Sequence, residues 1–362
     1  MRLFLLIICC VFSTSAFSKG LKLVPIATDL PASWSITLLD DEQLLLTHRQ
    51  GGLGLVKGES IKFIEFQPQD LFAQGQGGLL DIALHPEYIS NGWLYLSYAA
   101  GTLEDNYLKI VRFKLQNLQS DSPSVTSVEQ IFRVAQSKDT PVHFSGRMAF
   151  DQQGYLLITT GDGFDYREQA QITSSHLGKI LRMSDTGKAV PDNPFYSQAD
   201  APESFVFSKG HRNSQGLIVL PEGTIIAHEH GPAGGDEMNI IKSGVNYGWP
   251  VVTNGMDYIG ATISPFKDYP GMQLPALDWT PSIAPSSMIF YQGNKFPALQ
   301  DHYLVTGLKF MRLYVINKNF EPDATLFAET QTRLRDIAAS KKGDIYILGD
   351  GEPATLYKVM EK

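Results

Sequence analysis

The sequence predicts an all-β chain folded as a six-bladed β-propeller. A strand–turn–strand unit recurs six times along the 362 residues, while apolar stripes at the i, i+3, i+4, i+7 spacing of helices are nearly absent. No Pro-rich or Gly/Ser-rich linker divides the chain. Radial repetition of antiparallel blades leaves few free sheet edges. This arrangement fits the pattern better than its alternatives, a pair of β-sandwiches or a β-helix.

Each copy of the unit is a polar turn, often with glycine, that leads into an apolar strand. The turns begin at Asp40, Ser90, Gln152, Pro221, Leu299 and Lys341. Their spacing of roughly forty to eighty residues is typical of blades that carry insertions on one face. The segment 21–30 precedes the first copy without forming a full unit. We therefore expect it to supply the outer strand that closes the ring, and we expect residues 19–362 to form a single domain.

The N-terminus has the pattern of a cleaved secretory signal peptide. Residues 3–12 are apolar after the basic Arg2, and residues 13–18 are small and polar, with Ala16 and Ser18 at the two positions that a signal peptidase reads. The apolar stretch is too short to span a bilayer, which disfavours a membrane anchor, and no later segment is long enough. The sequence thus predicts a signal peptide over residues 1–18 and export to the periplasm.

Composition narrows the class of partner. The formal net charge is −8, and hydrophobic residues make up 43% of the chain. Nucleic acids and anionic membranes need a basic face, which this charge disfavours. The two cysteines, Cys9 and Cys10, both lie in the predicted signal peptide. We therefore expect a mature protein without disulfides.

Polar residues gather where predicted inner strands begin, which in a propeller is the rim of the central channel. Gln76 lies between glycines before one strand. The stretch "HFSGR" places His143, Gly146 and Arg147 at the start of another. We expect Gly146 to let the backbone approach a ligand and Arg147 to be a structural partner of a neighbouring blade. Taken alone, Gln76 and His143 are more typical of an ordinary turn than of a binding site.

The segment 208–250 has the densest set of candidate ligands. His228 and His230 suggest zinc, but strand alternation puts Glu229 on the opposite side and no third nitrogen or thiolate ligand is evident. Carboxylates, backbone carbonyls and glycines instead suit calcium.

Cations cluster in two later segments. Lys309 follows one predicted strand, and Arg333 and Arg335 alternate into another, so both arginines should face one side. Such a cluster in a chain of negative net charge predicts an anionic ligand.

These segments together resemble a known family. "HFSGR", "GHRNSQGL", "EHGPAGGDEMNII" and "NYGWP" occur in this order between Gln76 and Asp350. In this they are similar to the soluble, pyrroloquinoline quinone (PQQ)-dependent glucose/sorbosone dehydrogenases, and most of all to the aldose sugar dehydrogenases. The resemblance implies a six-bladed propeller that oxidises the anomeric carbon of aldoses to lactones, with PQQ and calcium as cofactors and an external electron acceptor.

The resemblance also implies roles for single residues. His143 would be the general base, and Arg212 would stabilise negative charge on the quinone oxygen. The implied cofactor contacts are Gln76, Arg212, Asn213, Lys309, Arg333, Arg335 and Asp350. The implied metal ligands are the carbonyls of Gly231 and Pro232 for a calcium on the quinone, and Glu237 with the Tyr247 backbone for a second, structural calcium.

One position departs from the family pattern. Val142 replaces an aspartate that precedes the base in glucose-specific members, which leaves open what orients His143. Without that carboxylate we expect a histidine pKa of about 6.5. Short loops predict an open site and broad aldose use. A calcium-dependent lactonase-type hydrolase and a non-catalytic sugar-binding propeller remain the alternatives.

Overall fold

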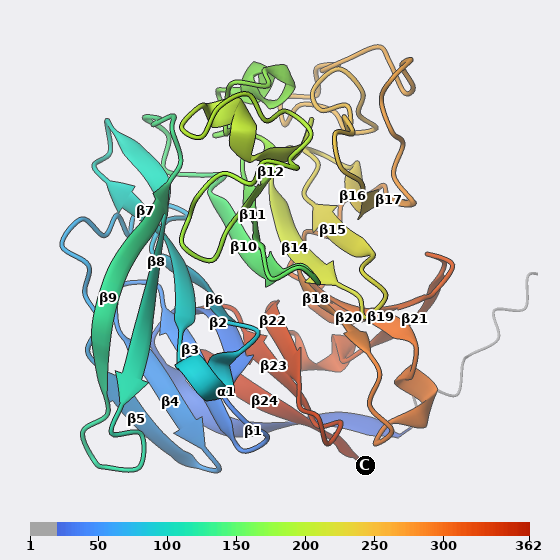
Figure 1. The fold of residues 1–362 in the computed structure, drawn as a ribbon. Coiled ribbons are helices and arrows are strands. Elements are labelled where there is room, and N and C mark those ends of the chain that lie inside the picture. The colour runs from blue at the N-terminus through green and yellow to red at the C-terminus, as the bar shows by residue number, and fades with distance from the viewer. Residues whose placement is uncertain (1–19) are drawn as a thin grey trace, which may run out of the picture.

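Six four-stranded antiparallel sheets are arranged around a central axis (Figure 1), which confirms the predicted six-bladed propeller. The computed structural model describes residues 20–362, so the predicted signal peptide lies outside the described residues. Within that range the one α-helix is α1 (Tyr88–Asn91), and no helix there is long and apolar enough to cross a membrane. Four short 3-10 turns complete the helical content: Arg167–Gln171, Pro202–Phe205, Pro297–Leu299 and Ala328–Thr330.

The first five blades are each built from four consecutive strands, numbered from the channel outward. The first three blades contain β2 (Ser33–Leu38), β3 (Gln43–His48), β4 (Leu53–Lys57), β5 (Ser60–Ile64); β6 (Leu79–Leu84), β7 (Leu94–Gly101), β8 (Asn106–Gln116), β9 (Ser124–Arg133); and β10 (Ser145–Phe150), β11 (Leu156–Thr160), β12 (Lys179–Met183), β13 (Val206–Lys209). The next two contain β14 (Ser214–Val219), β15 (Ile225–Glu229), β16 (Asp236–Ile241), β17 (Leu277–Trp279); and β18 (Pro285–Tyr291), β19 (His302–Gly307), β20 (Arg312–Asn317), β21 (Pro322–Leu326).

The sixth blade joins the two ends of the described chain. It contains β22 (Leu334–Ala339), β23 (Ile345–Gly349), β24 (Ala354–Glu361) and, as its outer strand, β1 (Leu21–Leu30). β1 pairs antiparallel with β24 from Leu21 opposite Glu361 to Leu30 opposite Ala354. The expected closing strand is therefore confirmed.

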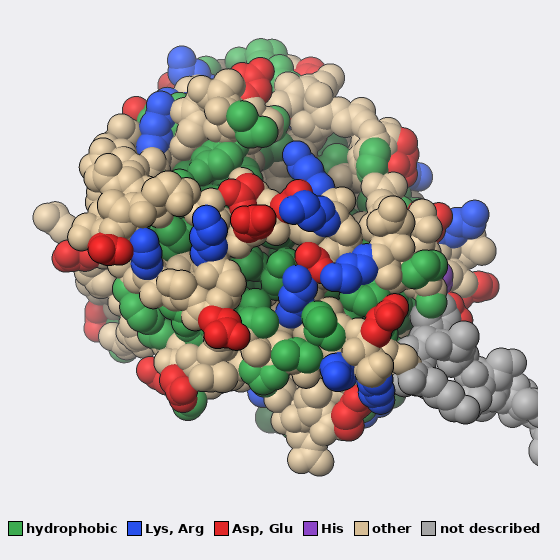
Figure 2. All heavy atoms as spheres, turned by 90° about the horizontal axis from the view of Figure 1, so that it is seen from below, with side chains coloured by type: hydrophobic (Ala, Val, Ile, Leu, Met, Phe, Trp, Pro, Cys, Tyr) green, Lys and Arg blue, Asp and Glu red, His purple; other side chains and the backbone are tan. Residues whose placement is uncertain are grey.

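The second strand of each blade explains the continuous apolar runs in the sequence. Leu44, Leu45 and Leu46 of β3 are all at most 2% exposed, although their side chains alternate between the two faces of the sheet. Neighbouring blades cover both faces, so no polar position is required. The core consequently lies between the blades, while Lys and Arg mix with Asp and Glu on the outer face seen in Figure 2.

The inner strands share a feature that the sequence did not reveal. All six of them, β2, β6, β10, β14, β18 and β22, have a register shift against their second strand within their first four residues. A bulge re-aims the side chains that it carries. The residues inside these shifts include Ser35, Asp81, Arg147, Gln215, Ser286 and Arg335, and most of them meet at the channel axis.

Arg147 contacts all six blades from this position. Its guanidinium binds the carboxylates of Asp81 and Asp336 at 3.0 and 3.1 Å and the carbonyls of Gln215 and Ser286, and it lies 4.1 Å above the Trp34 ring. Because Arg147 is only 6% exposed, this network fills the middle of the channel. The expectation that Arg147 is a structural partner of a neighbouring blade is confirmed and extends to the whole ring.

Candidate active site

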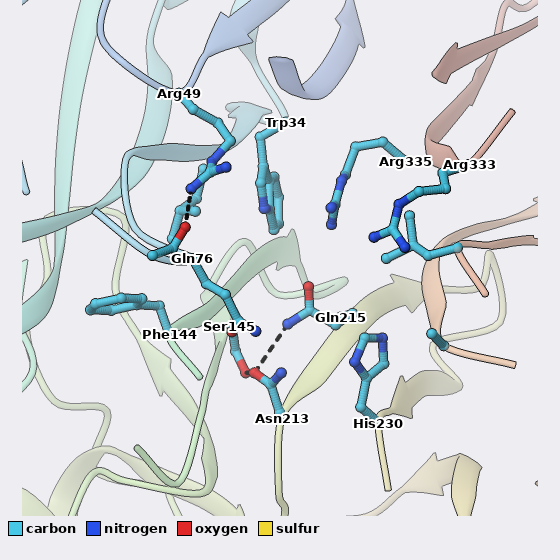
Figure 3. Close-up of a pocket in the computed structure, with 14 residues that line it drawn as sticks. Trp34, Arg49, Gln76, Phe144, Ser145, Asn213, Gln215, His230, Arg333 and Arg335 are labelled. Carbon is cyan, nitrogen blue, oxygen red and sulfur yellow. Dashed lines mark hydrogen bonds between the residues drawn. The ribbon is translucent and has the colours of Figure 1, made fainter. Parts of the chain in front are cut away.

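A polar cavity occupies the channel where the inner strands begin (Figure 3). All six blades contribute residues to its wall, so the cavity exists only when the ring is closed. The side chains labelled in Figure 3 are Trp34, Arg49, Gln76, Phe144, Ser145, Asn213, Gln215, His230, Arg333 and Arg335.

One side of the cavity is cationic. Arg49, Arg333 and Arg335 line it, and Asp350 pairs with two of them: its Oδ1 accepts from Arg335 at 2.7 Å and its Oδ2 from Arg333 at 2.8 Å. Burial lowers the pKa of Arg49, and the nearby Arg335 guanidinium lowers it further. Three guanidiniums against this one paired carboxylate leave excess positive charge, which suits a ligand with carboxylates.

Two amides on the other side are oriented by their neighbours. The Asn213 Oδ1 accepts from Ser145 Oγ at 3.0 Å and from Gln215 Nε2 at 3.1 Å. The Gln76 Oε1 accepts from the His143 backbone N–H at 2.8 Å. Because both oxygens are engaged, the amide N–H groups are the ends of these side chains that remain to donate to a ligand.

His143 lies next to this wall and is held by a carboxylate. Its Nδ1 is 2.7 Å from Asp162 Oδ1, and Asp162 also accepts from the Phe164 N–H and the Trp249 Nε1. A carboxylate acceptor makes Nδ1 the donor, so Nε2 is the basic nitrogen of the neutral ring. Asp162 therefore resolves the question that Val142 left open: another acceptor holds the ring.

The surroundings of His143 favour its neutral form. Burial lowers its pKa, the hydrogen bond to Asp162 opposes this, and the cations Arg212 and Lys138 lower it further. The net direction is below the usual 6.5. The value expected from the sequence is therefore too high, because that expectation contained neither the burial nor the two cations.

The backbone around His143 is strained. His143, Ser145 and Phe164 have φ angles of 54°, 57° and 69°, in the left-handed region that side chains disfavour. Such residues cluster at functional sites, where the surrounding structure holds them in place.

Gly146 has a positive φ as well, but for a reason that differs from the expectation. A Cβ there would lie 2.9 Å from Leu80 Cδ1 and 3.1 Å from Ser97 Oγ, both on the neighbouring blade. The glycine therefore permits blade packing, and the space beside it is not open to a ligand.

Arg212 is buried between the cavity and the insertion that links β16 to β17. Its Nη1 donates to the carbonyls of His230 and Gly231 at 3.0 and 2.9 Å, and its guanidinium lies 5.3 Å from the Trp249 ring. The carbonyl of Gly231, one of the two expected ligands of the central calcium, thus lies beside the expected catalytic arginine.

Glu237 lies apart from the cavity, among other acids. It faces Glu229 on β15 and Asp278 on β17, one residue per strand. Burial raises the pKa of the Glu237 carboxyl well above its usual range, and Glu229 and Asp278 raise it further. Beside it, Asn239 Oδ1 is buried without a hydrogen-bond partner in the described structure. Oxygens crowded in this way favour a cation.

Of the other residues expected at the site, Tyr247 lies near the acidic residues Glu229, Glu237 and Asp278, whereas Lys309 lies outside the cavity. The Tyr247 ring stacks on His211, whose Nδ1 is 3.0 Å from the Glu229 carboxylate. Lys309 does not line the cavity and is exposed, 5.6 Å above the Phe310 ring. His230 donates from Nε2 to the Pro285 carbonyl. Within residues 20–362, no cluster of three His, Cys, Asp or Glu has the arrangement of a metal site.

Sequence reasoning missed three residues of the site. Asp162 follows β11 in "TTGDG", a stretch for which no role was predicted. Trp249 lies in "NYGWP" and was given no role, and Arg49 was not singled out. The one signal that pointed to any of them is the carboxylate of Asp162, two residues after the end of the second strand of its blade.

Comparisons with known proteins agree with this geometry. A family model described as glucose/sorbosone dehydrogenase matches residues 30–358. Aldose sugar dehydrogenase YliI of Escherichia coli is 34% identical over 334 residues, which cover 90% of this chain and 89% of that protein.

Solved structures are similar across nearly the whole chain. The apo-form of the soluble aldose sugar dehydrogenase from Escherichia coli has a TM-score of 0.88 at 31% identity and covers 94% of this chain and 100% of its own. The PQQ-bound aldose sugar dehydrogenase from Streptomyces coelicolor has a TM-score of 0.78 at 27% identity, with coverage of 95% and 99%. The chain thus belongs to the glucose/sorbosone dehydrogenase family.

Proposed function

We propose that this protein is a periplasmic, PQQ- and calcium-dependent aldose sugar dehydrogenase that converts aldoses to lactones. The observation that carries the proposal is the His143–Asp162 pair, a buried, oriented base next to a cavity lined by three arginines. Family membership supports the oxidoreductase class, and the PQQ-bound Streptomyces relative supports the cofactor.

The donors of the cavity fit PQQ, which carries three carboxylates and a quinone. Arg49, Arg333 and Arg335 match the carboxylates, and the N–H groups of Asn213 and Gln76 match carbonyl or carboxylate oxygens. When bound, PQQ supplies a quinone that accepts hydride from the anomeric carbon.

His143 moves the proton of this reaction. Its Nε2 takes the proton from the anomeric hydroxyl, while Asp162 keeps the ring in the required tautomer and orientation. The Arg212 guanidinium would stabilise the negative charge that develops on the quinone oxygen. The products are the lactone and the reduced cofactor, which an external electron acceptor would reoxidise.

Two calcium sites belong to the proposal. The carbonyls of Gly231 and Pro232 would hold an ion that polarises the quinone. Glu237 and the Tyr247 backbone would hold a structural ion, which the crowded acids and the unpartnered Asn239 oxygen support.

The structural ion gives a prediction about stability. Calcium should raise the melting temperature of the unmutated protein above its value in chelator, because a ligand that binds only the folded state stabilises it. Glu237→Gln should abolish most of this difference. Differential scanning calorimetry measures both, and equal melting curves in calcium and chelator would exclude the site.

The activity itself is tested on purified protein loaded with PQQ and calcium. Dye reduction should follow addition of several different aldoses and should require PQQ. His143→Gln should lose about 10²–10⁴-fold in turnover and still bind PQQ, while His302→Gln, far from the cavity, should behave as the unmutated protein. If the loaded protein oxidises none of the sugars, the proposal is wrong.

A further inference from the structure

We propose that Phe164 and Tyr258 form an aromatic platform that carries the pyranose ring of the aldose in front of His143. This inference rests on the proposed function and deepens it by naming the groups that bind the sugar. The two residues come from different blades, Phe164 from the turn after β11 and Tyr258 from the insertion between β16 and β17.

The two rings adjoin both groups expected to act in the reaction. The Phe164 ring meets the His143 imidazole edge to face, with centroids 5.2 Å apart and an interplanar angle of 79°. The Tyr258 ring is nearly parallel to that of Phe164, at 16° and 6.4 Å. The Tyr258 hydroxyl accepts from Arg212 Nη2 at 3.4 Å. A sugar lying on these rings would therefore be within reach of the base and of the arginine.

Neither ring is explained by core packing. Phe164 is 43% exposed and Tyr258 is 62% exposed, although large aromatic side chains usually bury most of their surface. Phe164 also keeps a φ of 69°, held by the hydrogen bond from its N–H to Asp162 at 2.9 Å. An exposed side chain kept in a strained backbone conformation next to a base indicates a role in binding.

The platform is held in place before any ligand arrives. Asp257, next to Tyr258, is 3.7 Å from the Arg167 guanidinium of the blade that carries Phe164. Met256 on the other side of Asp257 forms a backbone bridge with Ala233. These contacts link the two loops to each other and to the turn between β15 and β16, and any ordering they provide reduces the entropy that binding would otherwise cost.

The chemistry of the platform selects a class of ligand. One face of a pyranose presents C–H groups that stack on an aromatic ring, whereas recognition of each hydroxyl requires placed hydrogen-bond groups. Stacking contacts C–H groups and not the hydroxyls themselves, so it distinguishes aldoses less sharply than hydrogen bonds to each hydroxyl would. The platform therefore predicts binding of many aldopyranoses with similar strength, which is a physical reason for broad aldose use.

Phe164→Gly removes the aromatic ring and keeps the backbone conformation, because glycine adopts the positive φ without strain. The variant therefore tests the ring and not the fold. We expect Phe164→Gly and Tyr258→Ala each to raise KM about tenfold for all aldoses tested, equivalent to about 1.4 kcal/mol, with a much smaller change in kcat. Phe164→Tyr and Tyr258→Phe should restore most of this binding. Tyr269, another exposed aromatic residue in the insertion that carries Tyr258, is the control, and Tyr269→Ala should leave KM unchanged.

Three measurements accompany the kinetics: the melting temperature, the PQQ dissociation constant, and direct binding of sugar to the protein loaded with reduced PQQ. We expect the melting temperature of Phe164→Gly to be no lower than that of the unmutated protein. Its PQQ affinity should be unchanged and its sugar binding weaker. Unchanged KM values, or a loss confined to PQQ affinity, would overturn it. If the unmutated protein turns over aldoses normally in that experiment, the proposed function survives and only the platform fails.

Discussion

At the scale of single residues, Asp162 decides what His143 can do. Its carboxylate binds the imidazole Nδ1, the Phe164 N–H and the Trp249 indole at once, and it is fully buried. Three donors from two blades fix the carboxylate, and the carboxylate fixes the ring. Asp162 is a positioning residue because it acts on the substrate only through His143.

Asp162→Asn should reduce kcat by about 10²–10⁴-fold, the usual effect of losing a positioned base, without loss of PQQ binding. The pH profile gives a second readout. The base must be neutral, so the rate falls as pH drops through the His143 pKa, which lies below 6.5. Since the Asp162 anion raises that pKa, its removal should move the acid limb to still lower pH. An acid limb that moves to higher pH in Asp162→Asn would contradict the assignment of Asp162 as the positioning residue of His143.

Arg335 gives a residue-scale test of the cavity. Arg335→Ala should weaken PQQ binding by tenfold or more, because a hydrogen bond to a charged group contributes about 1.5–3 kcal/mol. Titration of the apo-protein with PQQ measures the effect. Lys309→Ala is the informative comparison, because Lys309 is exposed and does not line the cavity. A larger loss for Lys309→Ala than for Arg335→Ala would show that the ligand lies elsewhere.

At the scale of elements, the outer strand β1 holds the ring closed. It adds the fourth strand of the sixth blade and contributes Leu30, which is 1% exposed. Without β1, β24 becomes an edge strand with unpaired backbone groups, which favours aggregation.

A chain that begins at Pro31 should therefore unfold at lower urea concentration than a chain that begins at Gly20, and it should aggregate more readily. Urea unfolding followed by tryptophan fluorescence, with light scattering, measures both effects. Equal midpoints for the two chains would show that the ring closes without β1.

At the scale of the whole molecule, Arg147 connects the blades at the channel axis. Its two carboxylate partners, Asp81 and Asp336, lie on blades two and six and are nearly fully buried. Burial raises the pKa of Asp81, and the Arg147 charge opposes this. The Arg147 side chain therefore both joins the blades and supplies the positive charge that the buried carboxylates of Asp81 and Asp336 require.

Arg147→Met should destabilise the protein by about 3–5 kcal/mol, because it leaves buried carboxylates without their counter-charge. Adding Asp81→Asn and Asp336→Asn should recover part of the loss. Lys62→Met, which breaks a solvent-exposed pair, should cost at most about 1 kcal/mol. Urea unfolding gives these differences, and additive losses in the triple variant would argue against the coupling.

The sequence by itself determined the propeller, its number of blades and its closing strand. These features depend on local signals: turn residues, apolar runs and their repetition. The resemblance also marked His143, Arg212, Asn213 and Arg335, which the structure brings to one end of the channel.

Only the tertiary structure decided how these residues are joined. Asp162 is 19 positions from His143, Trp249 is 87 positions from Asp162, and Asp336 is 189 positions from Arg147. The Arg147–Asp336 pair forms only when the blades close into a ring, and the Asp162–Trp249 pair forms only when neighbouring blades pack together. The bulges at the starts of the inner strands leave no mark in the alternation of apolar residues. Contacts across blades depend on the geometry of the whole ring, which local sequence patterns do not contain.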